Sequence, residues 1–355
     1  MRSLRLLQCL AVLLMLPAAP ALAQSAPPAP VCKAPSDGRI VGGCTVPNGE
    51  APWAVEIIDM TVYTKQDLHD DLVNETRENG QSDFASHRQD WDIRLACGGV
   101  AISNAWILTA KHCTQDAPEN VRFDDLPAYF KAHFRVHIGS SSILPGKGSL
   151  CPVIDVRPYP DDDQADVALI RIDPATCTPP GTLAPIRVAG TAGDDPLREN
   201  FVSANEFDVY GWGMTKARAA NAKLGVTSGR RRDDNLAHLD PNSSDLRRAT
   251  VHFIDAKACA ARPGYRAMMT RTRICAGVDQ GGTDQCSGDS GGPLVMNLSP
   301  PSGLIEPVLV GVVHGGIGCA LRRHPGVYEY APAYLDWIRS VVGAGNLVQA
   351  GPPPP

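Results

Sequence analysis

The chain has 355 residues, of which 43% are apolar and 20% are charged, and this provides enough core for one large or two ordinary globular domains. The formal net charge is −5 at pH 7, and an acidic surface argues against nucleic acid as the main partner. The composition therefore favours a globular protein that acts on something other than nucleic acid.

The N-terminus has the pattern of a secretory signal. Arg2 and Arg5 precede an apolar run over residues 6–16, and an Ala-x-Ala cleavage site ends at Ala23. The run is too short to span a membrane comfortably, which argues against the alternative of a membrane anchor. We therefore expect residues 1–23 to be removed, and the product to be secreted or periplasmic with no membrane attachment afterwards.

The segment that follows resembles a propeptide. Residues 24–39 are rich in proline and alanine and are not expected to fold alone. They end in Arg39, and Ile40-Val-Gly-Gly43 follows as an abrupt apolar start, which predicts a processing site between Arg39 and Ile40. The new α-amino group of Ile40 would supply a buried Asp289 with a cation, which gives a zymogen switch. The alternative is an accidental Arg-Ile pair in a linker.

From Ala51 onward, short β-type runs alternate with turns, which is typical of an all-β barrel or sandwich. The expected strands cover residues 54–58, 99–102, 106–108, 134–138, 167–172, 207–210, 249–254, 293–296, 307–313 and 326–328. One helix with an apolar face is expected over residues 331–342. The tail, residues 343–355, ends in four prolines and is expected to be disordered.

Two long polar stretches, at about residues 60–92 and 214–246, interrupt the strands. The first is rich in acids, and the second carries Arg230-Arg-Arg232, a candidate nicking site. Loops of this length are usually functional or disordered. Each is interpreted as a solvated insertion or, alternatively, as a surface that binds a partner.

The cysteine content indicates disulfides and an oxidising compartment. Of eleven cysteines, only Cys9 lies in the expected signal, so an even number of ten remains. No Cys-x-x-Cys pair occurs, and His133 and His137 are interpreted as ordinary surface or core histidines. The sequence therefore predicts neither a metal site nor a cofactor.

The stretch Gly281–Val295 surrounds Ser290 with small residues. Glycines permit a sharp turn, and such a turn can point successive N–H groups into one concavity. Ser290 is therefore the candidate nucleophile, and the N–H groups of Gly288 and Ser290 form the candidate oxyanion hole. A serine hydroxyl needs a base and a group that orients the base, and the candidates are His112 and Asp166. The alternative for the turn alone is a polar surface loop.

From Ile40 to about Val342 the chain resembles the chymotrypsin/trypsin family of serine endopeptidases. The matching motifs occur in order along the chain: Ile40-Val-Gly-Gly43, Cys97-Gly-Gly99, Thr109-Ala-Lys-His-Cys113, Asp166-Val-Ala-Leu-Ile170, Gly211-Trp-Gly213, Asp289-Ser-Gly-Gly-Pro293 and Pro325-Gly-Val-Tyr328. The resemblance implies two six-stranded antiparallel β-barrels, with the active site between them and a C-terminal α-helix. It also implies that Ser290 attacks a peptide carbonyl, that His112 transfers the proton and that Asp166 orients His112.

The resemblance further implies three disulfides, Cys97–Cys113, Cys259–Cys275 and Cys286–Cys319. The pairing of the remaining cysteines stays open, and any bridge to Cys32 would keep the cut propeptide attached; these cysteines are Cys32, Cys44, Cys151 and Cys177.

By the same resemblance, Asp284 lies at the base of the specificity pocket, and Gly316 and Gly326 lie at its walls. A buried carboxylate in an open slot favours a substrate with Arg or Lys before the cleaved bond. The implied partners are protein or peptide substrates, an activating protease and protein inhibitors.

Three residues depart from the family pattern. Lys111 replaces a small residue before His112 and is expected to lower the pKa of His112. His314 replaces a serine that hydrogen-bonds the triad aspartate, and its imidazole could donate the same bond or crowd the site. Gly315 replaces a tryptophan that walls the next subsites. These departures keep a rival open, a catalytically impaired binding module with the protease fold. Two weaker rivals are a protease with another residue preference and an exported ester hydrolase.

Overall fold

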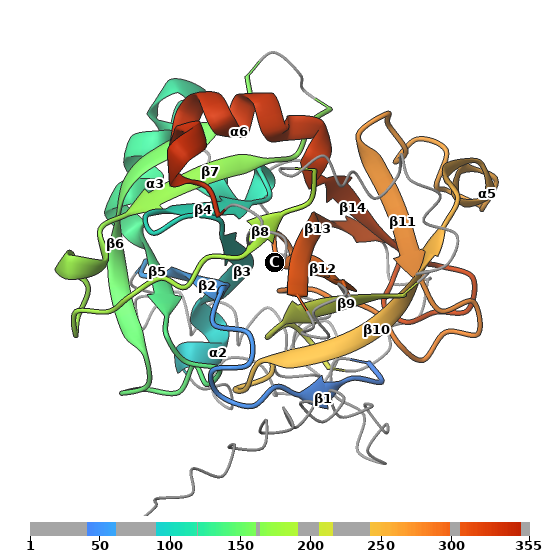
Figure 1. The fold of residues 1–355 in the computed structure, drawn as a ribbon, viewed down its shortest axis with the longest axis horizontal. Coiled ribbons are helices and arrows are strands. Elements are labelled where there is room, and N and C mark those ends of the chain that lie inside the picture. Colours follow the sequence, from blue (N-terminus) through green and yellow to red (C-terminus); the bar gives the residue numbers. More distant parts are fainter. Residues whose placement is uncertain are drawn as a thin grey trace, which may run out of the picture. The chain divides into compact units, whose positions relative to one another are not determined.

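The computed structural model describes residues 41–61, 90–118, 120–160, 164–190, 206–215, 242–298 and 306–348, all within one compact unit of the chain. Two antiparallel β-barrels form the framework of the described chain (Figure 1). The strands of the first barrel are β2 (Ala54–Asp59), β3 (Leu95–Ala101), β4 (Trp106–Thr109), β5 (Phe134–Ile138), β6 (Ser149–Pro158) and β7 (Ala168–Ile172). Those of the second barrel are β9 (Glu206–Gly211), β10 (Arg247–Ile254), β11 (Arg273–Gly277), β12 (Pro293–Leu298), β13 (Glu306–Gly316) and β14 (Gly326–Tyr330).

The first barrel closes in the order β2-β3-β4-β7-β6-β5. Its strands bury their inward side chains: Leu169, Ile170 and Ile172 on β7 are fully buried, whereas Arg171 is exposed. The guanidinium of Arg171 lies 5.8 Å from the ring centroid of Trp106 on β4, the neighbouring strand. Strand β7 is thus buried along nearly its whole length, as its nearly continuous apolar sequence indicates.

The second barrel closes because β9 pairs with both β10 and β12, which completes the ring β9-β10-β11-β14-β13-β12. Two short strands add to this sheet: β1 (Cys44–Thr45) pairs antiparallel with β10, and β8 (Arg187–Val188) pairs parallel with β13. The expected all-β fold of two six-stranded barrels is therefore confirmed.

Two barrel strands, β6 and β11, lie outside the strands expected from the sequence. Strand β6 contains Pro152 and ends at Pro158, and proline within a run argues against a central strand. Strand β11 begins with Arg273, whose charge masks the apolar pattern although its side chain is buried. Both strands depend on tertiary contacts that composition does not reveal.

The helices are short, and they are α2 (Asp90–Arg94), α3 (Leu126–His133), α5 (Ala256–Ala260) and α6 (Leu335–Val342). The expected C-terminal helix forms as a 3₁₀ turn, Ala331–Tyr334, followed by α6. Helix α3 was not expected, because only Leu126 and Phe130 bury on one face of its eight residues. Among the described residues, no helix has the length and hydropathy needed to cross a membrane.

The ordered chain continues past Val342, where the sequence suggested disorder. Residues Ala344–Asn346 form a 3₁₀ turn, and Leu347 is buried in the main apolar core. A single apolar side chain thus anchors the start of the tail, whereas residues 349–355 lie outside the described residues.

The structure contains the disulfides Cys97–Cys113, Cys259–Cys275 and Cys286–Cys319, which the resemblance implies. It also contains Cys151–Cys177, which answers part of the open pairing question. Cys44 is disulfide-bonded to a partner outside the described residues.

The ends of the two insertions meet. The N–H of Asn242 donates to Asp92 Oδ1 at 2.9 Å, and its side-chain amide donates to the carbonyl of Asp92 at 3.0 Å. Met214, at the start of the second insertion, pairs with Asn242. Residues 62–89 and 216–241, with Arg230 and the other candidate nicking residues, lie outside the described residues.

A buried glutamate and a buried histidine face each other inside the first barrel. Glu56 on β2 and His137 on β5 are cross-strand partners, with Glu56 Oε2 3.8 Å from His137 Nδ1. Neither carboxylate oxygen of Glu56 nor His137 Nδ1 has a hydrogen-bond partner among the described residues. His137 Nε2 donates to the carbonyl of Lys147 at 2.8 Å, so the unpaired Nδ1 of a neutral ring faces the carboxyl group. Two lone pairs facing each other repel, so a proton held on Glu56, whose pKa is raised by burial, favours this geometry.

The pair makes stability depend on pH. Burial raises the pKa of Glu56 well above 4.5 and lowers that of His137 below 6.5, partly offset by the bond to Lys147. The folded pair therefore keeps one proton, whereas the unfolded chain holds two below pH 4.5, one between 4.5 and 6.5, and none above. Stability from this pair is thus greatest between these values and falls as pH rises above 6.5.

We expect Glu56→Gln to remove the loss of stability on the alkaline side. Urea unfolding between pH 7 and 9 should show the wild-type protein losing up to about 1.4 kcal/mol per pH unit from this pair, and the variant not. Glu206→Gln changes an exposed strand glutamate and serves as the control, with an unchanged slope. Parallel slopes for Glu56→Gln and the wild type would contradict the shared proton.

Candidate active site

The candidate nucleophile lies in a tight turn before β12. The turn is closed by main-chain hydrogen bonds from Asp289 N to Cys286 O at 3.0 Å and from Gly292 N to Asp289 O at 2.8 Å. Gly288 has φ of +96°, which a residue with a side chain rarely adopts. Within the described residues, the N–H groups of Gly288 and Ser290 donate no hydrogen bond, so both are available to a ligand.

The turn is held against the first barrel. The N–H of Gly98 on β3 donates to the carbonyl of Ser290 at 2.8 Å. A Cβ atom on Gly98 would lie 2.9 Å from the Cα atom of Gly292, so the two backbones leave no room for a side chain. The glycines of both motifs therefore allow the two barrels to meet at the nucleophile.

His112 and Asp166 meet because β4 and β7 are antiparallel neighbours. Thr109, at the end of β4, pairs with Ala168, at the start of β7. His112 follows the end of β4, and Asp166 precedes β7, so both lie at one edge of the sheet. Asp166 Oδ2 accepts from His112 Nδ1 at 2.7 Å, and Oδ1 accepts from the main-chain N–H of His112 at 2.8 Å.

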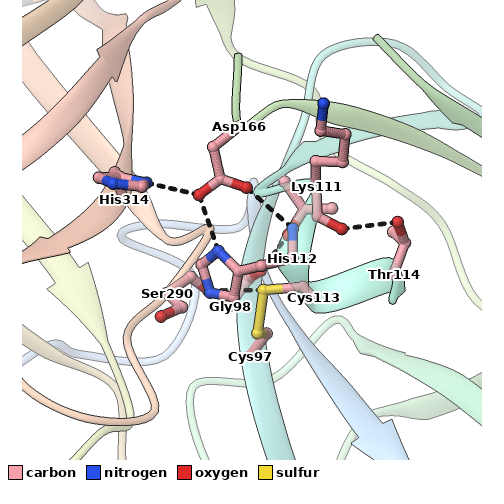
Figure 2. The surroundings of a disulfide bond; sticks show 10 residues. Cys97, Gly98, Lys111, His112, Cys113, Thr114, Asp166, Ser290 and His314 are labelled. Carbon is pink, nitrogen blue, oxygen red and sulfur yellow. Dashed lines mark hydrogen bonds and ion pairs between the residues drawn. A yellow bond between two sulfur atoms is a disulfide. The ribbon is translucent and has the colours of Figure 1, made fainter. Parts of the chain in front are cut away.

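Ser290 lies close to the His112–Asp166 pair but makes no hydrogen bond to the imidazole of His112 among the described contacts. Its carbonyl oxygen lies 3.6 Å from the sulfur of Cys113, the residue after His112. Figure 2 shows Ser290 beside the ring of His112, away from Asp166. Among the described contacts, Ser290 Oγ has no hydrogen bond to His112. Catalytic hydrogen bonds are often long in the free enzyme and tighten when substrate binds.

The electrostatics of this pair suit a base that is held by a carboxylate. Burial alone would raise the pKa of Asp166, but the charges and hydrogen bonds of His112 and His314 outweigh it and hold the pKa well below its usual range. Desolvation would lower the pKa of His112, and the charge and hydrogen bond of Asp166 raise it overall. The net shift of the His112 pKa is upward because Asp166 lies in direct contact, and a lowering by Lys111 stays a prediction.

His314 on β13 also contacts the carboxylate. Its Nδ1 donates to Asp166 Oδ2 at 2.6 Å, so of the two expected outcomes the ring acts as a donor. The carbonyl of the next residue, Gly315, accepts from the side-chain amide of Gln285 at 3.0 Å.

A second buried carboxylate, Glu329 on β14, supports Asp166 from behind. Glu329 Oε1 accepts from the N–H of Asp166 at 3.2 Å and from Arg273 Nε at 2.6 Å, while Oε2 accepts from the Tyr334 hydroxyl at 2.5 Å. Arg273 also donates to the carbonyls of Met268 and Gln164, at 2.8 and 2.5 Å. The sequence analysis missed this network, because its members carry no local motif.

Asp284 is buried and is held by two main-chain N–H groups. Its Oδ1 accepts from the N–H of Gln285 at 2.9 Å, and its Oδ2 accepts from the N–H of Ala320 at 3.2 Å. Burial raises the pKa of Asp284 well above its ordinary value despite these bonds. A buried carboxyl group in this state favours a neighbouring cation.

Gly316 and Gly326 lie beside two polar side chains. A Cβ atom on Gly326 would lie 2.7 Å from the Tyr328 hydroxyl, and one on Gly316 would lie 3.2 Å from Gln285 Nε2. The Tyr328 hydroxyl is buried and has no hydrogen-bond partner among the described residues. That the two glycines form the walls of a specificity pocket stays a prediction.

Asp289 points away from Ser290 into the interior. Its two oxygens accept from the N–H groups of Gly213 and Cys286 at 2.7 and 2.8 Å, and burial raises the pKa of Asp289 to about 6. Val41 is buried in an apolar cluster with Cys286, and its carbonyl accepts from Asp284 N at 3.2 Å. The chain therefore reaches this region directly after residue 40, whereas Arg39 and Ile40 lie outside the described residues.

His112, Asp166 and His314 bring three atoms of metal-ligand type within 4.8 Å of one another. Their N–O distances of 2.6 and 2.7 Å are those of hydrogen bonds. Ligands of a tetrahedral zinc ion lie roughly 3.3 Å apart, since each bonds at about 2.0 Å. Hydrogen bonding therefore accounts for the cluster, and we assign no metal to it.

Comparisons with known proteins agree with this geometry. The model of the trypsin family matches residues 74–236 and 220–338. The chain is also similar to trypsin 5G1 of Aedes aegypti, with 29% identity over 312 residues that cover 87% of this chain and 86% of the relative. Together with the two barrels and the disulfides, these matches show that the chain belongs to the trypsin family of serine proteases.

Proposed function

We propose that the protein is a secreted or periplasmic serine endopeptidase, made as a zymogen, that cleaves peptide bonds after Arg or Lys through an acyl-enzyme. The observation that carries the proposal is that three features meet where the barrels join. They are Ser290, the His112–Asp166 pair, and the main-chain N–H groups of Gly288 and Ser290, which donate no hydrogen bond within the described residues.

In the proposed reaction, Ser290 Oγ attacks the scissile carbonyl while His112 Nε2 takes the hydroxyl proton. The N–H groups of Gly288 and Ser290 stabilise the oxyanion, and Asp166 stabilises the imidazolium. His112 then gives the proton to the leaving amine, and the acyl-enzyme ester remains. Water repeats the sequence, with His112 again as base, and releases the acid and the free serine.

Specificity is proposed to reside in Asp284, with Gly316 and Gly326 leaving room for a long side chain. An arginine or lysine side chain that reaches Asp284 would pair with the buried carboxyl group and favour its ionised form. Gln285 and Tyr328 lie beside the two glycines and would supply further polar atoms.

Activation is proposed to follow cleavage after Arg39. The α-amino group of Ile40 would provide Asp289 with a cation, which its burial and raised pKa favour. Cys44 is paired outside the described residues, where Cys32 and Cys9 are the cysteines present. Residues 24–39 would therefore stay attached to the cut enzyme through Cys32 once the signal is removed.

The proposal is tested on protein cleaved after Arg39, with uncleaved Arg39→Gln protein as the control. The cleaved form should hydrolyse an arginyl amide, and a fluorophosphonate should label Ser290. Absence of both turnover and labelling would favour the rival, an impaired protease that acts as a binding module.

We expect Asp284→Ser to lower kcat/KM on an arginyl amide by about 10²–10⁴, from the roughly 3–5 kcal/mol lost when a buried ion pair loses one partner. A peptide library should show cleavage after Arg and Lys replaced by weak cleavage after uncharged residues. The control is Asp279→Ser, which removes an exposed acid paired with Arg262 at 2.7 Å. An unchanged cleavage pattern in Asp284→Ser would show that another group sets the preference.

A further inference from the structure

Two imidazoles share one carboxylate oxygen in this site. Asp166 Oδ2 accepts from His112 Nδ1 at 2.7 Å and from His314 Nδ1 at 2.6 Å. The ring centroids lie 6.4 Å apart, with planes at 75° (Figure 2). A carboxylate oxygen offers two lone pairs, so both acceptor positions of Oδ2 are used by histidines.

The shared oxygen fixes the protonation state of each ring. Both Nδ1 atoms face an acceptor and must carry hydrogen, so Nε2 is the basic atom of each neutral ring. The side chains of His112 and His314 are 45% and 22% exposed, so solvent reaches both rings. His314 Nε2 has no hydrogen-bond partner among the described residues.

Other charged groups around the site also act on the pKa of His112. Asp116 attracts a proton to His112, and Arg273 opposes it. Glu329 is already neutralised by Arg273 and accepts the N–H of Asp166. Lys111 adds a positive charge next to His112 in the chain.

We propose that His314, as a second Nδ1–H donor to Asp166 Oδ2, competes with His112 for the negative charge of Asp166 and so keeps His112 unprotonated to lower pH. His314 is a positioning residue in this role, because it acts on the reaction through Asp166. The proposal rests on the proposed protease function, in which neutral His112 is the base.

The first test compares His314→Ala with His314→Asn in the activated enzyme. In His314→Ala, Oδ2 would accept a hydrogen bond from His112 alone. The acidic limb in the pH profile of kcat/KM should therefore move to higher pH by about one unit. Asparagine places an amide N–H near the position of Nδ1 and should return the limb most of the way to the wild-type value. His252→Ala, an exposed histidine on β10, should leave the profile unchanged.

The second test is proton NMR of the same proteins, which needs no catalysis. The wild-type protein should show two strongly deshielded Nδ1–H resonances at mildly acidic pH, and His314→Ala and His314→Asn should each show one. The His112 ring should titrate at higher pH in His314→Ala. An acidic limb and a His112 titration that are unmoved in His314→Ala would overturn the proposal. If the ring titration shifts but no variant turns over substrate, the coupling stands and the proposed protease function fails.

Discussion

Replacing Ser290 with alanine is expected to lower kcat/KM on an arginyl amide by about 10⁶, because the proposed nucleophile is lost while the fold is kept. Ser290 Oγ has no hydrogen bond to His112 in the free protein, so its removal should leave the free energy of unfolding almost unchanged. The measurements are steady-state hydrolysis after cleavage at Arg39 and urea unfolding of the same protein.

The matched control is Ser287→Ala, in the same turn. Ser287 has an exposed side chain, and its carbonyl accepts from Met214 N at 2.8 Å, a contact that alanine retains. We expect this variant to keep wild-type kcat/KM within a few fold. Equal activities of Ser290→Ala and Ser287→Ala would remove Ser290 from the mechanism.

The second large effect concerns the buried ion pair behind Asp166. Arg273→Met is expected to lower the free energy of unfolding by about 3–5 kcal/mol, because it leaves the Glu329 carboxylate buried without its cation. Both side chains are almost fully buried, and the Nε–Oε1 distance is 2.6 Å. Urea unfolding should be measured in the Ser290→Ala background, so that self-digestion does not interfere.

Two further variants separate this effect from a general loss of packing. Arg273→Met/Glu329→Leu removes both charges and should recover most of the lost stability, as is often found for buried pairs. Arg157→Met removes an exposed pair with Asp155, 2.9 Å apart with side chains 60% and 30% exposed, and should cost less than about 1 kcal/mol. A loss for Arg273→Met no larger than that for Arg157→Met would contradict the role given to the pair.

The fold was predictable because the strands of the first barrel carry an alternating or continuous apolar pattern. The residues 134–138 coincide with β5, and residues 167–172 differ from β7 by one residue. Strand β11 was not predicted because it begins with a charged residue, Arg273. That residue is buried because it pairs with Glu329 on the neighbouring strand β14. No periodicity in a single strand reveals that a distant carboxylate neutralises an arginine.

The candidate site was predictable where residues follow one another in a motif. The glycines around Ser290 predict a turn, and in the structure Gly288 has the positive φ that such a turn needs. Glu56 and His137 show the opposite case, since they face each other only through the register of β2 and β5. The sequence shows that His314 departs from the family pattern. It does not show that His314 and His112 donate to the same oxygen of Asp166, because these residues lie on different barrels.

The hydrogen bond from Gly98 to the carbonyl of Ser290 has a consequence for the chain as a whole. His112 and Asp166 belong to one barrel and Ser290 to the other, so neither half carries all three groups of the proposed mechanism. Under that mechanism, a chain divided between the barrels would give two inert fragments, and turnover would return only as they associate. The recovered rate would then measure how tightly the two halves recognise each other.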